Sequence, residues 1–264
     1  MSIETTRRTE LFPFAARINR VSTVEPWRWL AAGWSDLRRT RLISVPYSLL
    51  FVAAGYAVTF GLYHIEAYHL IWPALTGFFL AAPAFAVGYY EASRRLEAGE
   101  RVGFTDILTA WRRYPSRIFG TGLALCFFLI LWIRTAALIY ALNYPYEMLT
   151  VQGVLNQTFF SLDGLMFLAA GTVIGAGFAV AAFLFAAISL PMILGERADF
   201  LPAVITSAIA VTRNPRAMAL WAVIIVVITG FGMVTALIGL IVTMPLIGHA
   251  SWHAYRALVR PADD

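Results

Sequence analysis

Long apolar stretches alternate with short basic ones along the chain. A membrane-spanning helix needs about 20 apolar residues, because each residue adds about 1.5 Å and the hydrocarbon core is about 30 Å thick. Four stretches have a length that suits one span each, namely 43–63, 70–90, 118–142 and 165–194. A fifth apolar region, 217–258, is roughly twice as long as one span requires.

The fifth region contains glycines near its middle, at Gly230, Gly232 and Gly239, which are typical of a break in a helix. We therefore expect a hairpin of two spans there, at about 217–233 and 235–252. The pattern as a whole predicts an all-α membrane protein with six transmembrane helices in a single domain, 25–260. Residues 1–24 and 261–264 are predicted to be tails, the first of them disordered.

The arginines give an independent test of the six-span pattern. All 20 basic residues are arginines, and with six spans every one except Arg134 lies on the same side of the membrane. The opposite loops, 64–69 and 143–164, contain none. Arginines are retained on the cytoplasmic side, so both termini are predicted to lie in the cytoplasm. The absence of lysine indicates a GC-rich bacterial genome, so the spans are expected to lie in a bacterial inner membrane. A five-span arrangement would put Arg256 and Arg260 outside.

Three segments between the spans are predicted to be amphipathic helices. After Pro26, which can begin a helix, Trp27, Leu30, Trp34 and Leu37 share one face. Related patterns occur at 104–111 and 201–212. Such helices can lie in the membrane interface, or they can pack on each other as a small cytosolic cap.

A threefold internal pattern is one interpretation of this order. Each unit would consist of an amphipathic helix, a basic turn and a membrane hairpin whose second helix carries a proline, at Pro83, Pro191 and Pro245. The intervals between these landmarks are unequal. A proline removes one helix hydrogen bond, so kinks are expected at all three.

Composition supports the membrane assignment and narrows the partners. Hydrophobic residues make up 60% and charged residues 13% of the chain, whereas soluble domains carry about 25% charged residues. Lipid is therefore the expected partner. The net charge of +5 comes from arginines beside spans, so no nucleic-acid binding is expected. The single cysteine, Cys126, excludes an intrachain disulfide and is expected to be buried.

Arg134 is the one ionisable residue well inside a predicted span. A charge at this depth is a candidate binding site for an anionic group. The alternative is structural, in which the side chain extends outward or pairs with Glu66, Glu147 or Asp163.

His249 and His253 are spaced so that both imidazoles lie on one face of the last helix, a spacing used by metal sites. A metal or haem would need further ligands, and Glu91 or Glu196 could supply one by approaching in space. The alternative is an interfacial anchor formed with Trp252, Tyr255 and Arg256. No cofactor is predicted.

Several residue types and motifs are absent, so nothing in the sequence argues for an enzyme or for an ion-coupled transporter. No Asp, Glu, Asn, Gln or Lys lies in the middle of a span, where ion-coupled transporters usually need them. The chain also has no Walker A, HExxH, GxSxG or GxGxxG motif.

Four stretches together resemble a bacterial family of predicted integral membrane proteins with a domain of unknown function. They are EPWRWLAAGWSDL (25–37), GYYEASRRLEAG (88–99), SLPMIL (189–194) and PLIGHASWHAYR (245–256). Some members of this family carry the label of cytochrome c oxidase subunits, which implies a loose respiratory association. The family brings no functional residues to carry over.

These observations predict a non-catalytic accessory, scaffold or assembly factor of a membrane complex. The alternatives are a transporter or channel for a small or lipidic substrate, and a metal- or haem-binding membrane protein. The oligomeric state stays open.

Overall fold

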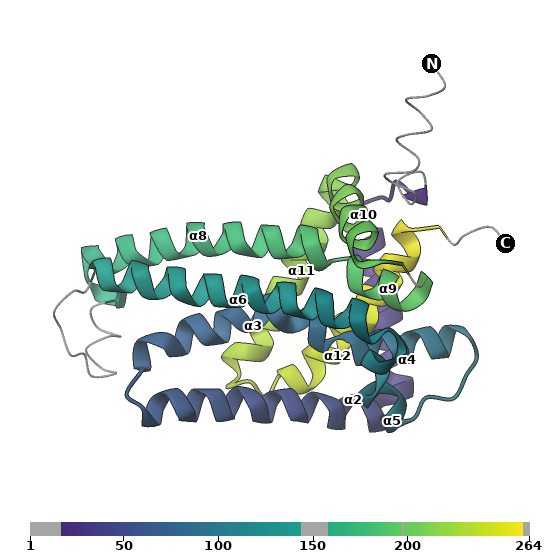
Figure 1. Cartoon of the computed structure of the whole chain (residues 1–264), viewed down its shortest axis with the longest axis horizontal. Coiled ribbons are helices and arrows are strands. Elements are labelled where there is room, and N and C mark those ends of the chain that lie inside the picture. The colour runs from purple at the N-terminus through teal and green to yellow at the C-terminus, as the bar shows by residue number, and fades with distance from the viewer. Residues whose placement is uncertain (1–16, 144–157, 197, 261–264) are drawn as a thin grey trace, which may run out of the picture. The chain divides into compact units, whose positions relative to one another are not determined.

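A computed structural model describes residues 17–143, 158–196 and 198–260. Within these residues the fold is all-helical and contains no strand, which confirms the predicted class (Figure 1). The helices are α2 (Glu25–His64), η2 (Tyr68–Leu70), α3 (Ile71–Phe85), α4 (Val87–Glu97), α5 (Phe104–Leu108), η3 (Ala110–Arg113), α6 (Pro115–Asn143), α8 (Leu162–Ala186), α9 (Ser189–Glu196), α10 (Phe200–Arg213), α11 (Pro215–Val234) and α12 (Leu240–Leu258).

Among the described residues, four helices are long and apolar enough to cross a membrane: Glu25–His64, Pro115–Leu142, Leu162–Glu196 and Pro215–Val234. They contain the predicted spans 43–63, 118–142, 165–194 and 217–233. The other two predicted spans, 70–90 and 235–252, coincide with α3 and the start of α4, and with α12. The described part of the chain thus contains four candidate spanning helices, and the count of six spans stays a prediction.

The long apolar region at the end of the chain forms a hairpin, as predicted. α11 ends at Val234, a turn follows, and α12 begins at Leu240. The turn contains Ala236 and Leu237, whose φ angles are positive, at 52° and 66°. This backbone conformation is strained for residues other than glycine. Gly232 lies inside α11 rather than ending it. A Cβ at Gly239 would lie 2.8 Å from the Cα of Gly232, so these glycines permit close approach.

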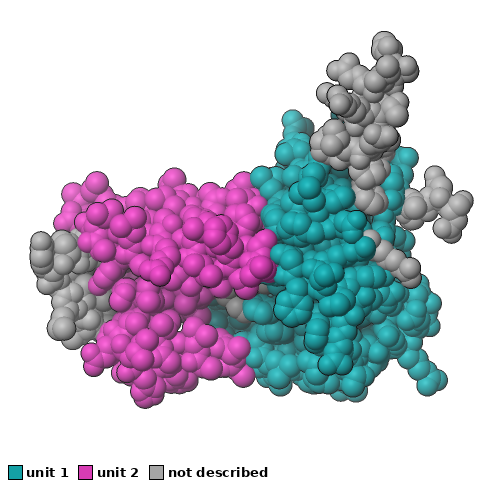
Figure 2. Space-filling model, in the orientation of Figure 1, with its two compact units in different colours: residues 1–52, 83–122, 183–264 teal, residues 53–82, 123–182 magenta. Residues whose placement is uncertain are grey.

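The chain divides into two compact units (Figure 2). Unit 1 comprises residues 1–52, 83–122 and 183–264, and unit 2 comprises residues 53–82 and 123–182. The amphipathic segments and all the described basic residues except Arg134 belong to unit 1.

The core of unit 1 is built from α4, α9 and the second half of α12, which pack together (Figure 1). Every residue from Val87 to Ser93 and from Ser189 to Leu194 is buried. A Cβ on Gly248 of α12 would lie 2.8 Å from the Cβ of Tyr89 in α4. At such distances only glycine fits without displacing the neighbouring helix.

The amphipathic segments pack on this core. α5 packs on α4, α10 packs on α9, and the first half of α2 packs on α12. The apolar face of α2 predicted from the sequence is only partly buried in unit 1. Trp29 and Leu37 are buried, whereas Trp27 and Trp34 are 56% and 44% exposed.

Helix breaks occur near two of the three prolines expected to cause kinks. The chain interrupts its helix at Ala86, after Pro83, and just before Ser189, near Pro191, but α12 continues through Pro245. Neighbouring side chains satisfy the polar groups at the breaks. The Tyr47 hydroxyl donates to the Phe85 carbonyl at 3.1 Å, and the Ile188 amide donates to Ser207 Oγ at 3.1 Å.

Unit 2 contains the end of α2, all of η2, and most of α3, α6 and α8. The Trp132 indole of α6 donates to the Pro73 carbonyl of α3 at 3.0 Å. A Cβ on Gly175 of α8 would lie 2.8 Å from the Trp132 ring. Cys126 is exposed rather than buried, because α6 turns this side away from its neighbours.

Candidate functional site

A stripe of polar residues runs along the buried face of α2. Asp36, Thr40, Ser44 and Ser48 follow one another at intervals of four residues, which places them on one face of the helix. All four are buried, with exposed fractions of 7%, 2%, 0% and 0%. Buried polar groups of this kind need hydrogen-bond partners, and α4 and α12 provide them.

His249 of α12 lies at the centre of the resulting network and is fully buried. Its Nε2 lies 3.0 Å from Ser44 Oγ and 3.2 Å from Thr40 Oγ1. Its Nδ1 lies 2.8 Å from the Oγ of Ser93 in α4. One imidazole thus links three helices of unit 1.

The donors and acceptors of the network fit one arrangement for a neutral His249. Ser93 donates its only hydroxyl proton to the Asp36 carboxylate at 2.7 Å, so its oxygen accepts from Nδ1–H of His249. Thr40 donates to the Asp36 backbone carbonyl at 2.9 Å. In this arrangement Ser44 is assigned as the donor to Nε2 of His249, and its oxygen also lies 2.9 Å from Thr40 Oγ1.

His253 closes the network at the rim of unit 1. Its Nε2 lies 2.8 Å from Asp36 Oδ2, and the two side chains are 29% and 9% exposed. The Asp36 carboxylate consequently accepts from both Ser93 and His253. We call the set Asp36, Thr40, Ser44, Ser93, His249 and His253 the histidine network.

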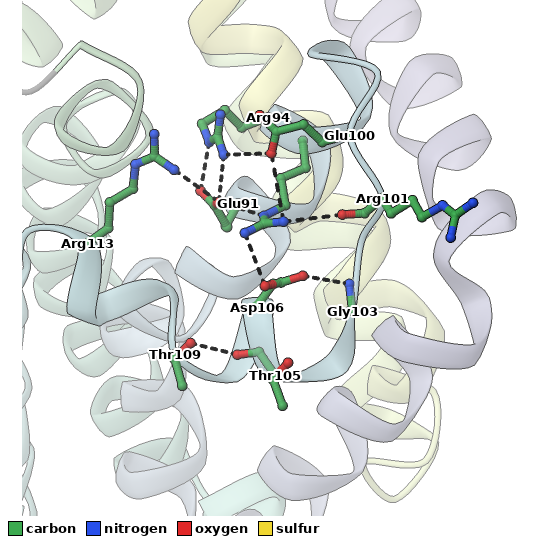
Figure 3. A network of polar contacts seen from close by, with 10 residues as sticks. Glu91, Arg94, Glu100, Arg101, Gly103, Thr105, Asp106, Thr109 and Arg113 are labelled. Carbon is green, nitrogen blue, oxygen red and sulfur yellow. Dashed lines mark hydrogen bonds and ion pairs between the residues drawn. The ribbon is translucent and has the colours of Figure 1, made fainter.

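A second polar cluster holds α4 to the loop and helix that follow it (Figure 3). The Glu91 carboxylate, 3% exposed, accepts two bonds from Arg94 at 2.8 Å and one from Arg95 at 3.0 Å. Arg113 of η3 adds a fourth at 3.2 Å. Burial alone raises the pKa of Glu91, but the hydrogen bonds and charges of these arginines hold that pKa below its usual value.

Arg95 also pairs with Asp106 of α5 at 3.0 Å, and the Asp106 carboxylate caps the Gly103 amide at 2.8 Å (Figure 3). On the next turn of α4, Glu97 accepts from the Trp252 indole and from Arg256, both at 2.9 Å. α4 is therefore the hub that connects α2, α5 and α12 through polar contacts.

The predicted site residues fall in different units. In unit 1, His253 bonds directly to Asp36, and His249 is linked to Asp36 through Ser93. Arg134 lies exposed on α6 in unit 2. Among the described residues, no group of three or more His, Cys, Asp or Glu could hold a metal ion. The metal site at His249 and His253 stays a prediction, and metal analysis of the purified protein tests it. Glu147, a predicted partner of Arg134, lies outside the described residues.

The sequence contained a signal for the histidine network that the sequence analysis missed. Small polar residues at four-residue spacing, from Asp36 to Ser48, mark a face that cannot be left against hydrocarbon. That stripe runs from the amphipathic segment into the first span. His249 and Ser93 could not be joined to it from spacing alone, because they are distant in sequence.

The all-helical fold, the apolar helices and the basic flanks define a class of protein, the helical integral membrane proteins. Within this class, residues 71–195 match the family described as "Predicted integral membrane protein (DUF2189)". The match confirms the resemblance to a family whose domain has no known function, over a shorter stretch than the four quoted motifs span. No curated protein and no solved structure gives a significant match.

Proposed function

We propose that this protein is a non-catalytic accessory component of a membrane complex, acting as a scaffold or assembly factor in the bacterial inner membrane. Six spans with both termini in the cytoplasm would place unit 1 at the cytoplasmic face. The arginine distribution supports this orientation, because the loops at 64–69 and 143–164 contain no arginine.

The observation that carries the proposal is the mutual satisfaction of the polar groups within the histidine network. The ionisable groups of the histidine network are hydrogen-bonded to one another and to hydroxyls. A fully satisfied buried network makes a fold rigid and specific. A catalytic or transport site would instead direct such groups toward a substrate.

Close helix packing around the network points the same way. A Cβ at Gly33 would lie 2.8 Å from the Cα of Ala250, so α2 and α12 are in backbone contact there. Unit 1 is thus suited to present a rigid surface. Exposed Trp27, Trp34 and Trp111 on the amphipathic segments offer large apolar areas to lipid or to a partner.

The proposal is tested by purifying the tagged full-length protein from native membranes in a mild detergent and measuring particle mass. We expect a discrete species heavier than the 29.2 kDa chain with its detergent belt. Recovery of the protein alone in several detergents and in polymer-excised native discs would contradict the proposal.

The orientation has a separate test. A fluorescent reporter that folds only in the cytoplasm, fused after Asp264, should be bright, and the same reporter inserted in 143–164 should be dark. A dark fusion after Asp264 would show that the predicted orientation is wrong.

A further inference from the structure

Arg134 lies at the centre of the exposed face of α6. Positions one and two turns away on this face are apolar and exposed: Phe127 60%, Leu131 38% and Leu138 59%. The opposite face is buried at Leu125, Ala136 and Ile139. We call Phe127, Leu131, Arg134 and Leu138 the Arg134 face.

The depth of Arg134 keeps its guanidinium within the apolar part of the helix. Arg134 precedes Asn143, the end of α6, by nine residues, or about 13 Å of helix. Tyr140, which stacks on His69 at 4.8 Å, marks an aromatic belt about 9 Å from Arg134. An arginine side chain reaches about 6 Å when extended, which leaves its charge short of that belt.

No described residue neutralises this charge. Arg134 forms no hydrogen bond or ion pair within the part of the chain that the structure describes. The acids of unit 2 that are described, Glu66 and Asp163, lie at helix ends. A guanidinium on a lipid-facing surface is unfavourable, and a partner of opposite charge within the membrane would offset that cost.

We propose that the Arg134 face binds a transmembrane helix of another protein that carries an aspartate or glutamate at the same depth. The inference rests on the proposed accessory function and names the kind of partner. A carboxylate fits because it can accept two parallel hydrogen bonds from a guanidinium, and this pair is strongest away from water. A second copy of this chain does not fit, because between residues 118 and 195 its acids are Glu147 and Asp163, neither of them in the middle of a span.

The test uses the full-length protein in its native membrane, with a photo-crosslinking amino acid placed at Leu138 or at Leu131. Val173 of α8, 72% exposed and also in unit 2, is the matched control position. We expect a discrete protein adduct from the Arg134 face and none from Val173. The adduct should fall at least tenfold in Arg134→Leu and persist in Arg134→Lys.

The crosslinked protein, identified by mass spectrometry, should contain an Asp or Glu inside a membrane span. The adduct should disappear when that acid is replaced by a neutral residue. It should return when the acid is instead replaced by arginine in a strain that carries Arg134→Glu. Arg134→Leu makes the helix more apolar and leaves membrane insertion intact, which quantitative immunoblotting verifies. Adducts with lipid only, or an adduct unchanged by Arg134→Leu, would overturn the inference.

The two proposals can fail separately. A heavy native complex whose mass is unchanged in Arg134→Leu refutes only the docking site. A protein that is always recovered alone refutes the accessory function as well.

Discussion

Removing one hydroxyl from the histidine network should destabilise unit 1 strongly. In Ser93→Ala, the Asp36 carboxylate loses one of its two side-chain donors, a charge-assisted bond whose loss costs about 1.5–3 kcal/mol. The Nδ1–H of His249 also loses its acceptor at a site that is 0% exposed, which adds about 1–3 kcal/mol. Because the two losses share one network they do not add fully, and we expect about 3 kcal/mol.

The assay is thermal unfolding of the purified protein in detergent. The folded fraction at each temperature is measured by size-exclusion chromatography with detection of tryptophan fluorescence. At about 2–4 °C per kcal/mol, the expected fall in Tm is about 6–12 °C. Thr212→Ala in α10 is the matched control, because that exposed hydroxyl donates only to carbonyls of its own helix. A Ser93→Ala shift no larger than that of Thr212→Ala would refute the hydrogen-bond arrangement.

Two further predictions test packing and charge. Gly33→Ala should lower the free energy of unfolding by about 1–3 kcal/mol through overpacking against Ala250. Gly61→Ala in the same helix, with open space at its Cβ, should be neutral or slightly stabilising. Equal Tm values for the two variants would contradict the close approach of α2 and α12. The depressed pKa of Glu91 stabilises the fold fully above about pH 4.3, the usual value, and this contribution is lost as the pH falls through the lower folded pKa. Glu91→Gln should therefore lower Tm at pH 7. In this variant the decrease of Tm below pH 4 should be smaller than in the wild type, and an unchanged pH profile of Tm would exclude a stabilising role for the Glu91 carboxylate.

The fold class was predictable because hydrocarbon imposes length and polarity on any chain that crosses it. The apolar run 217–258 was too long for one span, and it forms the hairpin of α11 and α12 that this length required. The turn lies a few residues beyond Gly232. The exact place was not predictable, because the glycines serve close packing in addition to breaking the helix.

The buried face of α2 was not predictable from apolarity, because lipid and protein interior are equally apolar. In a soluble protein, Trp27 and Trp34 would face the core. Here these tryptophans are exposed, while Gly33 and Ser44 are buried. Helix contacts in membranes favour small and polar residues, so a pattern based on large apolar residues identifies the outer face instead.

Arg134 was identified from the sequence because a charge inside an apolar run is visible without any structure. The exposure of Arg134 could not be predicted, because the direction of a side chain depends on which neighbours α6 packs against. Hydrophobic residues occupy every face of that helix, so no periodicity in the sequence separates its buried side from its exposed side.

The threefold internal pattern stays a prediction, and one set of contacts in unit 1 follows the order of its three repeats. Each helix that follows or contains one of the three prolines packs on the amphipathic segment of the next repeat. α4 packs on α5, α9 packs on α10, and α12, in the last repeat, packs on the first half of α2, in the first repeat. The contacts therefore close a cycle, although the sequence intervals are unequal.

The closing contact differs from the other two in what can enforce it. α4 is joined to α5, and α9 to α10, by short connections, so the chain itself keeps those partners near. α2 and α12 have no such link, since Thr40 and His249 are separated by 209 residues. Buried polar groups are a known means of fixing register between helices that connectivity leaves free. The histidine network lies at this junction, where directional hydrogen bonds are needed to select one pairing of the first and last helices.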